Sequence, residues 1–210
     1  MDFADVVRRR RMVRRYRPEP VPADAVARIV DAARRAPSAG FSQGQSFVVL
    51  TEPDARRRLA QLCDEGAYVA RGFAPWLSSA PVHVVLCTRP AAYLERYAAA
   101  DKAGRAPGGR DTWTVPWWYV DAGAALEALL LAAVAEGLAA GFQAIHAPDA
   151  VRDLLAIPAD VEPLGVVTVG HPAPDRPSGS LRRGRRPWDE TVFAGRWGVP
   201  LERPPSDRPS

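Results

Sequence analysis

The sequence predicts an α+β fold with four central strands, and three observations support this class. Helical patterns open the chain, short apolar strands with helices between them follow, and residues 120–138 form one long segment that is almost wholly apolar. A helix that is apolar all round must be buried, so we expect this segment at the centre of the domain or between subunits. We assign residues 1–199 to a single domain and residues 200–210 to a C-terminal tail, since 210 residues with 47% apolar side chains suit one sizeable core.

The N-terminal region combines a short helix with a dense run of arginines. Apolar residues at helical spacing and an aspartate placed to cap them predict a helix over residues 2–11. Seven arginines fall within residues 8–17, so the first of them lie on the end of that helix. Three prolines make residues 14–22 extended, and a second helix is expected over residues 23–35, ended by Pro37.

The rest of the chain alternates strands with helices, as its periodicity and its glycine and proline boundaries indicate. Alternating apolar residues over 81–88 predict a strand that is buried on both faces. In chain order we expect a loop at 36–46, a strand at 47–51, a helix from residue 52, a helical or irregular stretch at 68–78, the strand at 81–88, a helix at 90–100, a mobile excursion at 101–115, the apolar helix, a strand at 142–146, a helix at 149–155 and a strand at 163–171.

A second basic cluster, residues 182–186, lies near the other end of the chain. A run of arginines repels itself unless it is spread over solvent or faces an anion. Two such clusters folded onto one spot would bind a phosphate monoester, because guanidinium groups form planar, bidentate hydrogen bonds to phosphate. A solvated face or a nucleic-acid surface is the alternative, although neither a stacking pattern of aromatic residues nor a DNA-reading motif accompanies the arginines.

Residues 36–46 are mostly small or carry hydroxyl and amide groups. Such a loop lets backbone groups approach a flat polar ligand closely, whereas a plain connector is the alternative. Further along, Trp113, Trp117 and Trp118 gather just before the apolar helix. They would line a binding cleft, form a subunit interface or pack in the core.

Several kinds of site and location are disfavoured by what the sequence lacks. Neither the GxGxxG pattern nor a GxxxxGK pattern followed by Ser or Thr occurs, so the usual dinucleotide and triphosphate loops are not expected. Two cysteines and three histidines without companions at ligand spacing predict no metal site and no disulfide framework. We find no secretion signal. The uncharged part of the apolar segment 120–138 is shorter than a bilayer requires, so we expect a cytoplasmic protein that does not span a membrane.

An ordered set of landmarks over residues 2–196 resembles the FMN-dependent nitroreductases. The first landmark, segment 10–16, is similar to the family's Arg-Arg-Ser-x-Arg-x-Phe opening, and the second, residues 36–39 with Gln43, is similar to its Ala-Pro-Ser-Ser loop. The others are, in order, the apolar helix with Gly137 and Gly141 after it, the strand 163–172, and Arg185-Arg186-Pro187. Each landmark is weak alone, and their order carries the resemblance.

The resemblance implies a homodimer with a mainly antiparallel sheet of four to five strands flanked by helices, and with FMN bound at the interface. The FMN-binding residues that it implies are Arg10, Arg11, Met12, Arg14, Pro37, Ser38, Ala39, Gln43, Gly141, Phe142, Arg183, Arg185 and Arg186. The candidates for lining the substrate side are Phe41, Tyr68, Trp117 and Trp118. The two arginine clusters would then meet at the phosphate, across subunits.

The chain departs from the family pattern at three places. Met12 replaces the usual serine, Phe41 stands where asparagine is common, and Gly44-Gln45 replaces a Pro-Trp pair. These changes leave the phosphate contacts intact and alter the surroundings of the flavin ring. We therefore expect a subgroup whose substrate or flavin differs from that of the best-known members.

The reaction that the resemblance implies is ping-pong. A hydride from NADH or NADPH reaches flavin N5, the nicotinamide leaves, and a nitro, quinone or similar electron-poor compound is reduced in its place. The flavin carries this chemistry, so no protein acid or base is named. The alternatives are a flavin-dependent dehalogenase or flavin-fragmenting enzyme of the same fold, a flavin-binding protein without turnover, and a nucleic-acid-binding domain.

Overall fold

The computed structural model describes residues 1–102, 108–175 and 179–203. The chain divides into two compact units, Met1–Asp175 and Arg176–Ser210, and each is described by itself. The first unit holds the central sheet and all seven α-helices of the described residues. The assignment of residues 1–199 to one domain stays a prediction.

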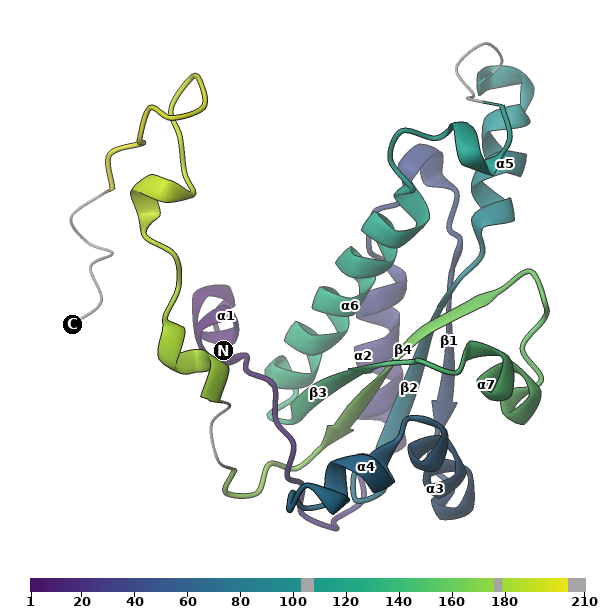
Figure 1. Ribbon diagram of the computed structural model, residues 1–210, viewed down its shortest axis with the longest axis vertical. Coiled ribbons are helices and arrows are strands. Elements are labelled where there is room, and N and C mark those ends of the chain that lie inside the picture. Colours follow the sequence, from purple (N-terminus) through teal and green to yellow (C-terminus); the bar gives the residue numbers. More distant parts are fainter. Residues whose placement is uncertain (103–107, 176–178, 204–210) are drawn as a thin grey trace. The chain divides into compact units, whose positions relative to one another are not determined.

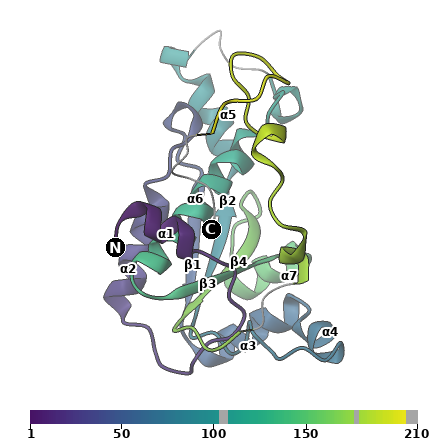
Figure 2. The ribbon, with the colours of Figure 1, turned by 90° about the vertical axis from the view of Figure 1, so that its left-hand side faces the viewer.

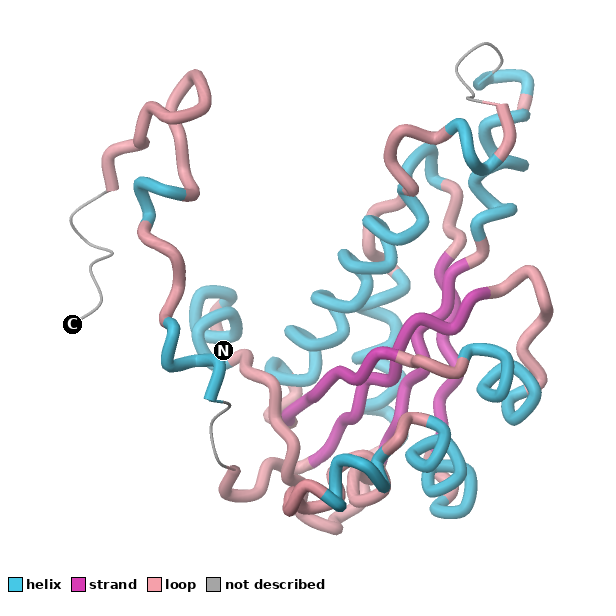
Figure 3. The backbone as a smooth tube through the Cα atoms, viewed as in Figure 1, coloured by secondary structure: helices cyan, strands magenta, loops and turns pink. Residues whose placement is uncertain are grey.

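A four-stranded antiparallel sheet forms the centre of the first unit (Figure 1; Figure 3). Across the sheet the strands are β1 (Gln45–Leu50), β2 (Val82–Thr88), β4 (Glu162–Gly170) and β3 (Ala139–Ala144). Every residue of β2 is buried, as the apolar residues on both of its faces predict for a strand covered on both sides. The predicted α+β class with four central strands is therefore confirmed.

Two helices cover one face of the sheet, α2 (Ala23–Arg34) and α6 (Trp117–Ala135), and they lie side by side (Figures 1 and 2). Ile29 of α2 and Leu129 of α6 are almost fully buried against Val84 and its neighbours in the sheet. The predicted apolar helix is thus the central helix of this layer. By length and composition alone α6 would also suit a membrane span, a test that core helices pass as well.

The other face of the sheet is covered by α3 (Pro53–Leu62) and α7 (Pro148–Leu155), with α4 (Glu65–Ala70) packed beside α3. Leu59 and Val151 are fully buried there, in a core that also contains sheet residues. Two further helices complete the first unit, α1 (Phe3–Arg9), which contacts α6, and α5 (Pro90–Ala98), which precedes the excursion. Asp2 caps α1 by accepting the backbone N–H of Asp5 at 2.8 Å, as the sequence indicates.

The third strand begins earlier than the sequence predicts. We expected the strand at 142–146, after glycines that end the helix, but β3 starts at Ala139 and ends at Ala144. Gly137 makes the turn alone, because its φ of 74° is a left-handed conformation that glycine adopts freely. Gly141 is a strand residue paired with Thr168. Of the predicted excursion, residues 103–107 lie outside the described residues.

In the second unit, residues 179–203 are described, and they form two short 3₁₀ turns, Gly179–Arg183 and Trp188–Glu190. Pro200 pairs with Phe193, and the backbone N–H of Leu201 donates to the carbonyl of Val192 at 3.1 Å. The described part of the predicted 200–210 tail is therefore paired with the residues that precede it.

Candidate functional site

The arginine segment, residues 8–17, is bonded to the sheet at two points. Its middle pairs with the edge strand β3, where the N–H of Val13 donates to the carbonyl of Ala140 at 3.0 Å. Its end pairs with the residues after β4, where the N–H of Arg17 donates to the carbonyl of His171 at 2.9 Å. A run of seven like charges is thereby held in one place by backbone hydrogen bonds.

Small residues in the sheet allow this close approach. A Cβ on Gly141 would lie 2.4 Å from the carbonyl oxygen of Val13, so a larger residue would push the arginine segment away. The buried hydroxyl of Tyr16 donates to the same carbonyl at 2.8 Å and contacts Oγ1 of Thr168 at 2.7 Å. Burial raises the pKa of Tyr16 above its ordinary value, so the hydroxyl keeps its proton and stays a donor.

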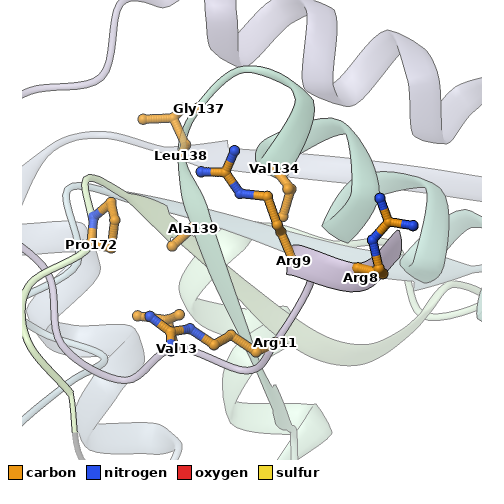
Figure 4. A pocket seen from close by; sticks show the side chains of 9 residues that line it. All are labelled: Arg8, Arg9, Arg11, Val13, Val134, Gly137, Leu138, Ala139 and Pro172. Atoms are coloured by element: carbon orange, nitrogen blue, oxygen red, sulfur yellow. The ribbon is translucent and has the colours of Figure 1, made fainter. Parts of the chain in front are cut away.

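The arginine side chains of this segment point in three directions. Arg10 lies 3.5 Å from the carboxylate of Glu127 on α6, and Arg14 lies over the ring of Trp76 at 5.4 Å. Arg8, Arg9 and Arg11 line a hollow of about 340 Å³ beside the end of α6 (Figure 4). Of the residues expected to bind the cofactor, Arg11 lines this hollow, whereas Arg10, Met12, Arg14 and Gly141 do not.

The small-residue loop, residues 36–46, is fixed by side chains from two helices. The carboxylate of Asp121 accepts the N–H of Ala39 and the hydroxyl of Tyr93, each at 2.8 Å. Nε of Arg96 donates to the carbonyl of Gly40 at 2.8 Å, and within the loop Oγ of Ser38 accepts the N–H of Gln43 at 3.0 Å.

The backbone of this loop is strained. Phe41 and Gln43 have φ values of 59° and 50°, which are left-handed conformations that cost free energy for residues with a Cβ. Such strain persists only where the surroundings over-determine the conformation, as the bonds to Asp121 and Arg96 do here. Phe41 is also 74% exposed. A strained loop with an exposed aromatic residue is typical of ligand sites.

Sequence reasoning missed Asp121 as a residue of this site. The available signal is a charge at the start of an otherwise apolar helix, which is costly to bury unless it is hydrogen-bonded. The side chain is 7% exposed, and both of its bonds go to groups that face the loop. Asp121 therefore positions the loop and is not free to bind a ligand through those bonds.

Within one chain the hollow and the loop lie far apart. Asp121, near the start of α6, contacts the loop, whereas Val134, near its end, lines the hollow. Thirteen residues separate the two positions, which corresponds to about 20 Å along a helix. The arginine segment pairs with β3 at Met12 and Val13, beside Gly141, whereas Arg10 lies at Glu127 on α6. Among the described residues, no hydrogen bond or ion pair joins Arg10, Met12 or Arg14 to the predicted loop residues Pro37, Ser38, Ala39 and Gln43.

The four residues expected to line the substrate side fall into two kinds of environment. Trp118 is 2% exposed and packs edge to face on Tyr93 and Trp113, which is the core position that the sequence left open as an alternative. Trp117, beside it, is 41% exposed, and Phe41 is exposed in the loop. Tyr68 stacks on the exposed ring of Phe73 at 4.6 Å.

The remaining residues predicted to bind the cofactor are Phe142, in the first unit, and the second arginine cluster, in the second unit. The ring of Phe142 packs over Gly165, where an added Cβ would lie 2.2 Å from it, so this side chain faces the sheet core. Arg183, Arg185 and Arg186 lie exposed in the second unit, where Arg186 contacts Glu190 at 3.5 Å. Their meeting with the first cluster stays a prediction. Among the described residues, no three His, Cys, Asp or Glu side chains are grouped to hold a metal ion.

Comparisons with known proteins agree with this architecture. The model of the nitroreductase family matches residues 7–171. A putative NADH dehydrogenase/NAD(P)H nitroreductase from Methanothermobacter thermautotrophicus is 27% identical over 177 residues, which cover 82% of this chain and 78% of that protein. An FMN reductase (NAD(P)H) from Bacillus subtilis is 29% identical over 170 residues, which cover 78% of this chain and 63% of that protein.

A solved structure shows the same fold. The NADPH:FMN oxidoreductase from Vibrio harveyi, complexed with NAD+, superposes with a TM-score of 0.69 at 23% identity, covering 92% of this chain and 77% of that one. The α+β fold, with the arginine segment paired to its edge strand β3, is the fold of the nitroreductases. This chain belongs to the nitroreductase family. The resemblance to the nitroreductases is thereby confirmed, and so is the expected class of enzyme, an NAD(P)H-dependent flavin oxidoreductase.

Proposed function

We propose that this protein is a homodimeric oxidoreductase that binds FMN and moves a hydride from NADH or NADPH to a nitroaromatic compound, a quinone or a similar electron-poor acceptor. The observation that carries the proposal is the arginine segment, whose backbone is held at the sheet edge by hydrogen bonds. Relatives named for NAD(P)H and FMN chemistry support the same class.

The residues of the segment suit a flavin phosphate. Arg14 is half-buried, and its guanidinium group contacts the ring of Trp76 and no carboxylate among the described residues. Its backbone N–H is already bonded to Asp175 at 2.8 Å, so the main chain is fixed while the side chain keeps its donors. Guanidinium groups held in this way bind phosphate through charge-assisted hydrogen bonds.

A bound flavin supplies two-electron redox chemistry, and the protein supplies position and access. In our proposal Arg14, together with Arg185 and Arg186, holds the phosphate, and the small-residue loop lies along the ring. Phe41 presents an exposed aromatic surface where flat substrates would stack, and Tyr68, which is stacked on Phe73, would line the same side. The reductant and the acceptor would use this surface in turn, which is the order of a ping-pong reaction.

We propose that two copies of the chain form this arrangement. The loop is held by Asp121 at the start of α6, whereas Arg14 lies on Trp76 with its backbone N–H bonded to Asp175, so the loop that contacts the flavin would come from the partner of the chain whose Arg14 holds the phosphate. Val120 on α6 is 49% exposed and Tyr119 41%, which leaves apolar surface on the helix that carries both regions. Pairing of two α6 helices would bury this surface and bring the loop of one subunit to the arginines of its partner. A cytoplasmic location is proposed with this activity.

The test is direct. Purified protein should show the absorbance of an oxidised flavin with one FMN per chain, and NADH or NADPH under argon should bleach it. Arg14→Ala and Arg185→Ala should lose the flavin while keeping their thermal transitions, because each removes charge-assisted bonds to phosphate. Arg15→Ala is the matched control, since Arg15 is an exposed arginine of the same segment.

Two outcomes would contradict the proposal. Stoichiometric FMN in both Arg14→Ala and Arg185→Ala would show that the phosphate lies elsewhere. Failure of the wild-type protein to take up any flavin supplied in excess would reject the function as a whole. Analysis of the products after turnover separates reduction of nitro compounds from removal of halogen or fragmentation of the flavin.

A further inference from the structure

The hollow is lined by Arg8, Arg9 and Arg11, and of its lining residues only Arg11 is among those that the resemblance assigns to FMN. Arg10 points to Glu127 and Arg14 to Trp76, and neither lines the hollow. Figure 4 shows Arg9 extending toward Leu138 and Gly137 and Arg11 extending toward Val13, with Arg8 standing apart from both. Its volume of about 340 Å³ is near the lower end of the range for sites that enclose a small molecule.

The charge in this hollow is largely unbalanced. Arg8 contacts Asp5, one turn away on the exposed surface of α1, and exposed pairs of this kind are weak. Arg9 contacts the sulfur of Met1 at 3.8 Å, and neither Arg9 nor Arg11 pairs with a carboxylate among the described residues. The acidic residue at the end of α6, Glu136, is already held by Arg28 through two bonds of 2.9 and 2.8 Å.

The opposite wall is apolar. It contains Val134 and Leu138 from the end of α6 and the turn after it, and Pro172 from the residues after β4. A free phosphate ion would leave most of this wall uncovered, whereas a phosphate attached to a ribose and a base would cover it. The limited volume of the hollow also favours one small ligand over an extended partner such as nucleic acid.

We propose that this hollow binds the phosphate monoester of a second nucleotide, separate from the flavin. Arg8 and Arg9 hold the phosphate, and the apolar wall contacts the nucleoside. The inference rests on the proposed function only in reserving Arg14 and the second arginine cluster for the flavin. The two sources with this chemistry are the adenosine 2′-phosphate of NADPH and a separate cellular nucleotide.

The experiment titrates flavin-loaded protein with adenosine 2′,5′-bisphosphate in a calorimeter, with adenosine and inorganic phosphate as comparison ligands. The bisphosphate should bind, adenosine should not, and the Arg8→Ala/Arg9→Ala variant should bind the bisphosphate at least tenfold more weakly. Its flavin content should equal that of the wild type. The control, Arg15→Ala, should match the wild type in both measurements.

The steady-state constants then separate the two sources. If the source is NADPH, the double variant raises KM for NADPH and leaves KM for NADH unchanged; if it is a separate nucleotide, both values stay while the bisphosphate is still lost. The proposal is wrong if the wild type does not bind the bisphosphate, if inorganic phosphate binds equally well, if the double variant binds it as tightly, or if that variant loses its flavin. A protein without flavin would refute the proposed function, and the same titration would still test the hollow.

Discussion

The arginine segment and the small-residue loop are both irregular in backbone, and they are fixed by different means. The arginine segment lies on the sheet and is fixed mainly by backbone hydrogen bonds, with the single hydroxyl of Tyr16 beneath it. The loop has few backbone bonds of its own and is fixed by the carboxylate of Asp121 and the guanidinium group of Arg96.

The difference follows from what lies under each region. The arginine segment crosses an edge strand, which offers unpaired backbone groups and a glycine that allows close approach. The loop lies between α5 and α6, whose own backbone groups are already bonded within each helix, so side chains must supply the contacts. We therefore expect the conformation of the loop to depend on the side chain of Asp121, and the position of the arginine segment to depend on the space beside Gly141.

Acid pH should lower the free energy of unfolding of the sheet, and with it the stability of both regions that adjoin the sheet. Burial lowers the pKa of His83 to about 4, from an ordinary value near 6.5, and its Nε2 lies 2.7 Å from the carbonyl of Leu77. Between these values the unfolded chain binds more protons than the folded chain, so stability is present at pH 7 and is lost as the pH falls towards 4. The loss is at most about 3 kcal/mol.

Urea unfolding between pH 7 and pH 4 measures this loss. His83→Gln should flatten the profile, because the amide can still donate to Leu77 and does not titrate. His146→Gln, at an exposed position, should leave the profile as it is in the wild type. An unchanged slope in His83→Gln would assign the acid sensitivity to other groups.

Asp121→Ala should release the loop. It removes the acceptor for the N–H of Ala39 and for the hydroxyl of Tyr93, and the expected cost is about 2–3 kcal/mol with loss of bound flavin. Tyr93→Phe removes one of the two bonds and should cost about 1 kcal/mol. Denaturant unfolding and flavin content measure both effects. Equal effects of the two substitutions would mean that the bond to Ala39 contributes nothing.

Gly141→Ala should displace the arginine segment by shape alone. The added Cβ would meet the carbonyl oxygen of Val13 and, at 2.8 Å, the ring of Trp76, and overpacking of this kind costs about 1–3 kcal/mol. Gly66→Ala is the control, since an added Cβ there meets nothing within 4 Å and alanine favours the helix. The two substitutions should therefore shift the denaturation midpoint in opposite directions. A neutral Gly141→Ala would mean that the segment adjusts without cost.

Tyr16→Phe should have the smallest effect, about 1 kcal/mol, because the backbone bonds of the segment remain. A double-mutant cycle with Thr168→Val isolates the contact between the two hydroxyls. A loss of flavin in Tyr16→Phe as large as that in Asp121→Ala would overturn the contrast between the two regions.

The sequence predicted much of the fold because the signals are local. The buried strand at 82–88, the capped first helix and the apolar helix follow from periodicity, from Asp2 and from an unbroken apolar run. The prediction failed at the start of β3, where Gly141 was taken as part of a turn. A glycine in a strand and a glycine in a turn have the same local signal, and only the approach of Val13 distinguishes them.

By itself the sequence determined the family, the element types and the positions of the arginines, because these depend on residues close together in the chain. The tertiary structure decided which arginine points where, and that Asp121 holds a loop 82 residues away. It also placed the loop and the hollow at opposite ends of α6. Contacts of this kind depend on how the sheet and the helices pack. No local sequence pattern predicts a contact between two residues that are distant in the chain.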